Sequence, residues 1–327
     1  MSEVTIRTRG LGKRFGEVTA LDAVDVEARA GTVLGLLGHN GAGKTTLVHI
    51  LSTLSQPSTG SATVAGFDVR TQGAQIRRRI GVTAQHTAVD HRLSGTANLV
   101  LVARLLGARP RTARRRAAQL VEAFGLTAAA NRPAGSYSGG MRRRLDLAMS
   151  LVADPVVLFL DEPTTGLDPV SRVNLWETVE ALVRQGTTVL LTTQDLHEAD
   201  RLADRITVLS KGRVVASGTT AELKSQTGRR FVHLSVGRDR RERAAAALRP
   251  HGYHPTAGQG GTDLVVGVDA SAELAVIVQI LVAAEVPIDG LALSEPTLDD
   301  VYLALTSPGS ATAAEPGSSP HAPVGAS

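Results

Sequence analysis

Eight residues near the N-terminus combine the side chains and the backbone freedom that phosphate binding requires. In order they are Gly38, His39, Asn40, Gly41, Ala42, Gly43, Lys44 and Thr45. They match the pattern G-x-x-x-x-G-K-S/T at every position. The glycines let backbone N–H groups approach an anion without a Cβ in the way. Lys44 supplies a positive charge for the β- and γ-phosphates, and the hydroxyl of Thr45 can ligate Mg²⁺. The segment therefore predicts a site for a nucleoside triphosphate and its magnesium ion.

The residues on either side of this loop are those that would hold it in place. Residues 32–37 predict a buried strand. Thr46 follows the loop directly and, as the first residue of 46–51, begins a predicted helix. The N-terminal end of that helix would point its positive dipole at the phosphates. Only four of the 35 basic residues are lysines, yet a lysine stands at the loop position where a compact ammonium is needed.

A pair of acidic residues ends the apolar run at 156–160. A buried central strand delivers its carboxyl end to the ligand edge of a parallel sheet, and Asp161 and Glu162 stand at that end. Beside the phosphate loop, Asp161 can hold Mg²⁺ through water, and Glu162 can orient or deprotonate an attacking water. An apolar strand followed by two acids is common by itself, so this prediction depends on the phosphate loop.

A second glycine-containing segment offers another place for an anion. Ser138, Gly139 and Gly140 stand at the start of a predicted helix at 140–152, and they offer a hydroxyl, unencumbered amides and a helix N-terminus. One chain has one nucleotide phosphate tail to bind, so a second anion site requires another subunit. Taken alone, a glycine-rich loop without chemical function is the simpler interpretation.

Together these segments resemble the ATP-binding subunit of ABC transporters, over about residues 4–218. The resemblance implies that Ser138, Gly139 and Gly140 are the signature motif, which contacts the γ-phosphate bound to the other subunit. It therefore implies a head-to-tail homodimer that clamps two nucleotides. Met141 is the one departure from the family's usual Ser-Gly-Gly-Gln.

The same resemblance implies roles for four further residues. Asp168 lies in the D-loop, at the dimer interface, and Gln85 stands at the Q-loop position that contacts Mg²⁺ or water and senses the membrane partner. Phe15 matches the aromatic side chain that stacks on adenine. Gln194 replaces the family's switch histidine; its amide can donate a hydrogen bond to the γ-phosphate but cannot carry a charge. His197 follows three residues later, and we expect it to face elsewhere.

Three segments resemble a narrower group, the daunorubicin/doxorubicin-resistance branch of these ATPases. They are residues 137–145, 192–194 and 295–302, and they extend the resemblance to about residue 306. This resemblance implies a partner that is an integral membrane permease encoded separately. It also implies a peripheral location at the cytoplasmic face of the cell membrane, and export of a drug or another hydrophobic compound.

The elements that must position these residues alternate between helix and strand. Helices are predicted at 140–152, 170–184 and 196–203, and strands at 156–160, 188–192 and 206–210. The alternation predicts a mostly parallel sheet with helices on its faces, so the fold class is α/β, with a P-loop NTPase core. We expect this ATP-binding domain to span residues 3–218, with a helical subdomain at 86–136.

Beyond the ATP-binding domain the sequence predicts a smaller module and a tail. Residues 228–306 predict an accessory α+β domain of the split βαβ, ferredoxin-like type. Residues 307–327 carry proline, glycine, serine and alanine without an apolar pattern, which predicts disorder.

The composition excludes some kinds of site. The chain has no cysteine, so it has no disulfide, thiolate metal site or cysteine nucleophile. No run approaches the roughly 18 apolar residues needed to span a bilayer, and the most apolar segment, 274–284, predicts a buried helix. The net charge of +4 comes from arginine clusters, one of them at 142–144. Such clusters could contact nucleic acid or anionic lipid, but they lack interleaved aromatic residues, which favours solvated helix faces.

Three other functions share the phosphate loop. A soluble ATPase of this fold could act on ribosomes or nucleic acid, but relatives that act on ribosomes usually carry two such loops and this chain has one. An importer subunit would use the C-terminal module for regulation, and a small-molecule kinase would leave residues 138–140 without a purpose. We therefore expect an ATP-hydrolysing subunit of a bacterial ABC exporter, with ATP and Mg²⁺ as cofactors and no nucleic acid partner.

Overall fold

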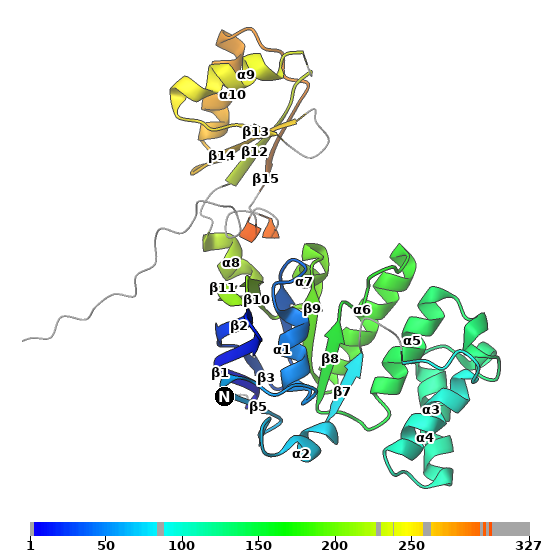
Figure 1. Cartoon of the computed structure of the whole chain (residues 1–327). Coiled ribbons are helices and arrows are strands. Elements are labelled where there is room, and N and C mark those ends of the chain that lie inside the picture. The colour runs from blue at the N-terminus through cyan, green and yellow to red at the C-terminus, as the bar shows by residue number, and fades with distance from the viewer. Residues whose placement is uncertain are drawn as a thin grey trace, which may run out of the picture.

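The centre of the fold is a six-stranded sheet (Figure 1). The computed structural model describes residues 3–83, 88–226, 230–237, 239–257, 263–294, 297–298 and 301–302. In spatial order the strands are β11 (Arg213–Gly218), β10 (Arg205–Ser210), β4 (Val33–Leu37), β9 (Thr188–Thr193), β8 (Val157–Asp161) and β7 (Ile80–Thr83). β11 pairs antiparallel with β10, and the other neighbours pair in parallel. The mostly parallel sheet that the sequence predicts is therefore confirmed.

The strands at the centre of this sheet are buried on both faces, which explains their unbroken apolar sequences. Every residue of β4, β8 and β9 is buried. Because successive side chains of a strand point to opposite faces, Val157 and Phe159 join one hydrophobic core while Leu158 and Leu160 join the other. The carboxyl ends of these strands then meet at one edge, where a site can form.

Five of the described helices share one core on one face of the sheet: α3 (Gly95–Leu105), α4 (Pro110–Ala123), α5 (Gly139–Ser150), α6 (Pro169–Arg184) and α7 (Leu196–Leu202). Of these, α5, α6 and α7 contact the strands, whereas α3 and α4 pack against each other and against α5. Two short 3₁₀ turns, η1 (Thr127–Ala129) and η2 (Ala134–Ser136), join α4 to α5. The helices predicted at 140–152, 170–184 and 196–203 are confirmed within two residues at each end, and α5 begins one residue earlier than predicted.

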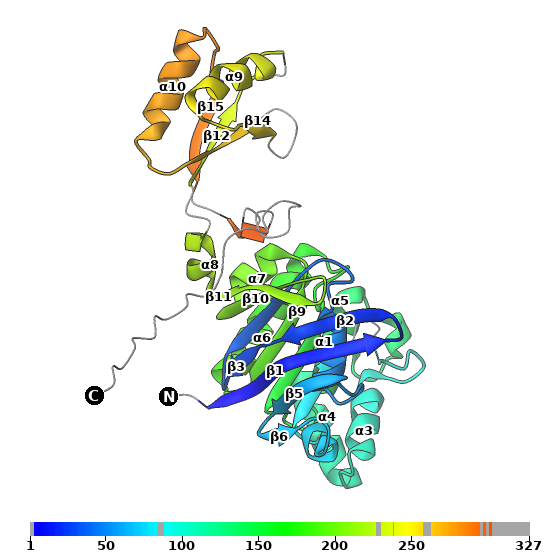
Figure 2. The ribbon, with the colours of Figure 1, turned by 60° about the vertical axis from the view of Figure 1, so that its left-hand side comes forward.

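An antiparallel sheet and one helix cover the other face (Figure 2). The sheet consists of β1 (Val4–Phe15), β2 (Val18–Val24), β3 (Glu27–Arg29), β5 (Thr59–Val64) and β6 (Phe67–Asp68). Helix α1 (Lys44–Leu51) contacts β2, β5 and β8, so it lies between the two sheets. The short helix α2 (Gly73–Arg77) leads into β7. The strand β1 is 12 residues long, and it pairs with β2, β3 and β5.

The C-terminal part has a sheet and a core of its own. After α8 (Thr220–Gln226), its elements are β12 (Arg230–Ser235), α9 (Arg241–Leu248), η3 (Arg249–His251), β13 (Thr256–Ala257), β14 (Asp263–Val268), α10 (Glu273–Ala283) and β15 (Gly290–Ser294). The strand order is β13-β14-β12-β15, with antiparallel pairs throughout. This β-α-β-β-α-β succession is the predicted ferredoxin-like arrangement.

The most apolar helix differs from its prediction. In α10 the side chains of Val276 and Val282 are 44% and 66% exposed, so the prediction of a buried helix is wrong. A helix that lies on one face of a single sheet can bury only the side that faces the sheet. Among the described residues, no helix is both long and apolar enough to cross a membrane.

The described residues at the C-terminal end of the chain pack against the first part. Leu298 and Val301 share a hydrophobic cluster with Leu37, Ile206 and Leu223, which belong to β4, β10 and α8. They do not join the core of the β12–β15 sheet. The expected disordered tail lies outside the described residues, so it stays a prediction.

The core around Phe159 sets a test of the fold. Phe159 is fully buried, so we expect Phe159→Ala to lower the free energy of unfolding by about 3–5 kcal/mol, through lost burial and the cavity left behind. Urea unfolding followed by the fluorescence of Trp176, the only tryptophan, measures the change. Phe15→Ala is the matched control: that ring is 53% exposed, and its loss should cost under about 1 kcal/mol. Equal losses would contradict the placement of the two rings.

Candidate functional site

The phosphate loop joins the end of β4 to the start of α1, at the carboxyl edge of the central sheet. At two of its glycines, neighbouring backbone atoms leave no room for a side chain. A Cβ at Gly38 would lie 2.6 Å from the carbonyl oxygen of Leu209. Gly43 has a φ of +108°, and its Cβ would lie 2.7 Å from the carbonyl oxygen of Ala20. The loop can therefore keep this path only with glycine at both positions.

The start of α1 presents its backbone to the loop. Gly43 precedes the helix, and no side chain among the described residues caps that end with a hydrogen bond. The first N–H groups of a helix have no partner within the helix, so those of α1 point into the loop. This arrangement, with the helix dipole, suits a bound phosphate.

Lys44 is held over the loop by its own backbone. Its Nζ donates to the carbonyl oxygens of Gly38 at 2.6 Å and His39 at 3.2 Å. The side chain is 5% exposed, and Nζ lies 3.6 Å from Oε1 of Glu162. Burial lowers the pKa of Lys44, and the carboxylates of Glu162 and Asp161 oppose that shift. The loop lysine and the two acids of β8 therefore belong to one electrostatic cluster.

Asp161 ends β8 as a buried carboxylate with a hydroxyl donor on each oxygen. Thr45 Oγ1 donates to Oδ2 at 3.2 Å, and the hydroxyl of Thr192, from β9, donates to Oδ1. Hydroxyl and carboxylate oxygens are the hard ligands that Mg²⁺ prefers. The pair of Thr45 and Asp161, beside the phosphate loop, therefore fits a magnesium ion.

Glu162 leaves the strand in an unusual backbone conformation. Its φ is +47°, in the left-handed region that costs energy for residues other than glycine. Its N–H donates to Thr192, at 3.0 Å from the carbonyl oxygen and 3.2 Å from Oγ1. The side chain is 8% exposed and faces Lys44. The turn therefore aims the carboxylate at the phosphate loop rather than into solvent.

The second anion-binding segment forms the N-terminus of α5. Ser138 caps this helix, and its Oγ accepts from the N–H of Met141 at 3.2 Å. Among the described residues, no atom lies within 4 Å of the point where a Cβ of Gly139 would stand. A Cβ at Gly140 would lie 2.4 Å from Oγ of Ser171. Gly139 thus leaves the surface open, while Gly140 permits close packing against α6.

Asp168 lies directly beside this segment. It caps α6 by accepting from the N–H of Ser171 at 2.9 Å and from the hydroxyl of Ser171 at 2.6 Å. These hydrogen bonds lower the pKa of Asp168. Ser171 also packs against Gly140, so the start of α5 and the start of α6 form one surface.

A cavity of about 600 Å³ brings several of the predicted residues together. Asn40, Glu162 and Gln194 line it, together with Gly139 and Arg142. Gln194 therefore shares a cavity with the carboxylate of Glu162, as its position in place of a switch histidine suggests. His197, on α7, is exposed and is not among the residues that line this cavity.

Two predicted residues lie apart from this cluster or outside the structure. Phe15 ends β1 with its ring 53% exposed and with Nζ of Lys13 at 4.8 Å from the ring centre. An exposed ring of this kind can accept a base by stacking. Gln85 lies outside the described residues, so its predicted role stays a prediction.

Sequence reasoning missed some residues of the site. Thr192 donates to the carboxylate of Asp161 and accepts from the N–H of Glu162. Only its place at the end of the adjacent strand could have indicated these bonds. Arg143 belongs to the cluster that predicted a solvated helix face, but it is 8% exposed, so the prediction is wrong for this residue. Its partners include Asp146 on the same helix and the backbone of Pro163 and Asp161, which lie 20 and 18 residues away in the sequence.

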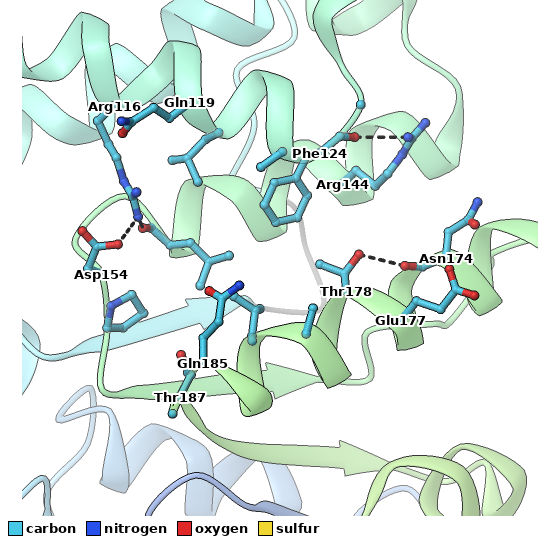
Figure 3. Close-up of a pocket in the computed structure, with 18 of the residues that line it drawn as sticks. Arg116, Gln119, Phe124, Arg144, Asp154, Asn174, Glu177, Thr178, Gln185 and Thr187 are labelled. Carbon is cyan, nitrogen blue, oxygen red and sulfur yellow. Dashed lines mark hydrogen bonds and ion pairs between the residues drawn. The ribbon is translucent and has the colours of Figure 1, made fainter.

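A larger cavity, of about 910 Å³, lies at the opposite end of β8 (Figure 3). α4, α5 and α6 line it, together with residues 154–156 that precede β8. Arg116 pairs there with Asp154, and Arg144 Nη1 donates to the carbonyl oxygen of Phe124 at 3.2 Å (Figure 3). Because Asp161 stands at the other end of the strand, this cavity is separate from the phosphate loop.

Glu198 is a buried acid beneath the site. It lies on α7, is fully buried, and accepts from Nε1 of Trp176 at 3.3 Å. Burial raises its pKa, and hydrogen bonds from Thr193, Thr164 and Trp176 oppose the shift.

Comparison with known proteins gives close relatives over nearly the whole chain. The sequence model described as ABC transporter matches residues 21–165. Daunorubicin resistance ATP-binding protein DrrA3 of Streptomyces coeruleorubidus is 47% identical over 310 residues, which are 94% of this chain and 97% of the relative. Daunorubicin/doxorubicin resistance ATP-binding protein DrrA of Streptomyces peucetius is 47% identical over 310 residues, 92% of each chain.

Solved structures share the fold. One, described as the ATP-binding subunit of an ABC transporter, gives a TM-score of 0.62 with 26% identity and covers 68% of this chain and 93% of that one. A dimeric ATP-binding cassette, described as a post-hydrolysis state bound to ADP and Pi, gives a TM-score of 0.60 with 24% identity. The match covers 65% of this chain and 98% of that one. At that identity the second match shows the fold alone.

The raised pKa of Glu198 predicts a pH-dependent gain in stability for Glu198→Gln. The folded protein holds the proton of this acid more tightly than the unfolded chain, whose ordinary pKa is 4.5. The free energy of unfolding of the wild type should therefore fall as pH rises from 4.5 to the raised pKa, by about 1.4 kcal/mol for each pH unit between them. Glutamine does not titrate, so the free energy of unfolding of the variant should rise relative to that of the wild type over this pH range.

Urea unfolding at a series of pH values, followed by circular dichroism, measures this difference. Glu177→Gln is the control, because it makes the same substitution at an exposed position of α6. A difference between Glu198→Gln and wild type that stays constant with pH would contradict the prediction.

Proposed function

This chain belongs to the ABC transporter family of ATP-binding subunits, as its motifs predicted, and we propose that it powers export of a drug or another hydrophobic compound. The compound would cross the membrane through a separately encoded integral membrane permease. The observation that carries the proposal is the convergence of Lys44, Thr45, Asp161 and Glu162 at one sheet edge. The drug-resistance relatives, which match this chain over almost its whole length, support the exporter over an importer.

ATP would bind with its phosphates on the loop at residues 38–46. The N–H groups at the start of α1 and the ammonium of Lys44 would hold the phosphate oxygens. Thr45, Asp161 and Gln85 would hold Mg²⁺, which when bound neutralises charge on those oxygens. The exposed ring of Phe15 would stack on adenine.

Hydrolysis would depend on two side chains that face the same cavity. The carboxylate of Glu162 would orient and polarise the attacking water, since its backbone aims it at the loop. The amide of Gln194 would donate a hydrogen bond to the γ-phosphate. Lys44 would stabilise the negative charge that builds on the phosphoryl oxygens.

Two copies would close head-to-tail over two ATP molecules. Ser138, Gly139 and Gly140 would contact the nucleotide of the other copy, and Asp168 would lie at the interface. The hydroxyl of Ser138 accepts from Met141, which leaves its hydrogen to donate to a phosphate oxygen. The open space at Gly139 allows a close approach.

The chain would work at the cytoplasmic face of the membrane through its helical segment, at residues 86–136. In α3 the side chains of Leu101, Leu105 and Leu106 are 44%, 78% and 54% exposed, respectively, with Leu106 as the helix's C-cap. An apolar surface of this kind supports contact with a partner protein. Closing and reopening of the dimer would then move the permease.

The alternative, an ATPase that acts on ribosomes or nucleic acid, depended on the arginine clusters. Arg143 is buried, and Arg144 donates to the backbone of Phe124. These two side chains are therefore engaged within the fold, which weakens that alternative.

Two substitutions should separate nucleotide binding from hydrolysis. Lys44→Ala should abolish ATP binding because it removes the charge that the phosphates meet. Glu162→Gln should keep ATP affinity but lower kcat by about 10²–10⁴-fold, because the amide is no base. Fluorescent-nucleotide titration and phosphate release measure the two properties. Lys224→Ala and Glu177→Gln, both remote from the loop, serve as controls. Rapid turnover by Glu162→Gln would refute its role.

The membrane partner can be captured with the stalled variant. Tagged Glu162→Gln, mixed with ATP and detergent-solubilised membranes of its host, should retain a polytopic membrane protein in ATP-dependent amounts. Lys44→Ala should show no ATP dependence, because it cannot bind the nucleotide. Recovery of ribosomal proteins or nucleic acid, with no membrane partner, would favour the alternative.

A further inference from the structure

One buried arginine contacts the backbone carbonyl groups on both sides of Glu162. Arg143 lies one turn into α5, and its Nε donates to the carbonyl oxygen of Pro163 at 2.7 Å. Its Nη2 lies 3.5 Å from the carbonyl oxygen of Asp161. The guanidinium is planar and rigid. It therefore restrains the distance and orientation between the carbonyl groups of Asp161 and Pro163.

The backbone of Glu162 needs such a restraint. Its φ of +47° is a conformation that residues other than glycine adopt at a cost, and surrounding contacts must maintain it. Thr192 bonds the N–H of Glu162 from one side. Arg143 holds the neighbouring carbonyl groups from the other side. Without Arg143 the chain could relax, and the carboxylate would turn away from the phosphate loop.

A buried acid connects this arginine to a further segment. Asp146, one turn later on α5, is 4% exposed, and its Oδ2 accepts from Nη1 of Arg143 at 3.2 Å. Its Oδ1 accepts from the N–H of Ala88 at 3.2 Å. Burial raises the pKa of Asp146, and the charge of Arg143 opposes that shift. A buried ion pair adds little net stability, because desolvation of the two charges offsets their attraction. The position of this pair beside the backbone of Glu162 therefore indicates a positioning role.

We propose that Arg143 is a positioning residue for ATP hydrolysis, which holds the main chain around Glu162 and, through Asp146, ties it to Ala88. The proposal rests on the function given above. Arg143 stands on the helix whose N-terminus, at residues 138–140, would meet the nucleotide of the other copy. A shift of that helix would move the carbonyl groups on both sides of Glu162. Binding of ATP by one copy would thus set the catalytic carboxylate of the other.

The test variant removes the buried pair without leaving a lone charge. Arg143→Met by itself would strand the carboxylate of Asp146, and the protein could fail to fold. Arg143→Met combined with Asp146→Asn is neutral and keeps an oxygen for the N–H of Ala88. Arg144→Met is the matched control, since Arg144 is the next residue and donates to Phe124, beside the other cavity. Trp176 fluorescence checks that each variant is folded.

The first measurement is steady-state ATP turnover by the full chain together with its captured membrane partner. We expect the double variant to lower kcat by about 10- to 100-fold, the range that misplacement of a reacting group produces. Its affinity for a fluorescent ATP analogue should stay within about threefold of the wild type, because the phosphate loop is untouched. Arg144→Met should match the wild type in both. Arg143→Lys should recover part of the rate, because an ammonium can replace only some of these bonds.

The second measurement separates positioning from a general structural effect. In a Glu162→Gln background, the double variant should not lower the single-turnover rate further, because there is no carboxylate left to position. A structural role would lower the rate by the same factor in both backgrounds. Equal factors, or a parallel loss of ATP affinity and kcat, would overturn the proposal. Absence of any turnover by the wild type with its partner would instead overturn the proposed function.

Discussion

The buried carboxylate of Asp161 is the interaction on which the site depends. Hydroxyl groups from two other segments donate to it, Thr45 at the start of α1 and Thr192 at the end of β9. It thereby joins the helix that follows the phosphate loop to two neighbouring strands of the sheet, β8 and β9. Thr192 in turn bonds the backbone of Glu162. The position of each chemical group near the nucleotide follows from this small set of bonds, made where parallel strands end together.

A balance of buried charges surrounds this carboxylate. Lys44 and Arg143 are the basic members, and desolvation lowers the pKa of both, while neighbouring acids oppose the shift. Asp146 and Glu198 are acids whose pKa values burial raises. Isolated buried charges are costly, and such groups persist when they are paired and hydrogen-bonded. These groups are therefore linked electrostatically, because movement of one group leaves another without its partner.

The chain also carries elements beyond the ATP-binding fold. The sheet of β12, β14, β15 and β13 has its own core, and α10 leaves Val276 and Val282 in solvent. Leu298 and Val301, in contrast, pack beside β4 and β10. Leu298 and Val301 are thus connected to the strand that precedes the phosphate loop.

The sequence by itself determined the local features of this protein, and only the tertiary structure decided how they combine. The phosphate loop, the acidic end of β8 and the alternating helices and strands were predictable, because each depends on residues adjacent along the chain. The long antiparallel strand β1 was not, since its pairing with β5 joins residues such as Ile6 and Val64, far apart in sequence. The burial of Arg143 was not predictable either. Three neighbouring arginines look alike in sequence, and only the arrival of the carbonyl group of Pro163 beside α5 distinguishes the one that is buried.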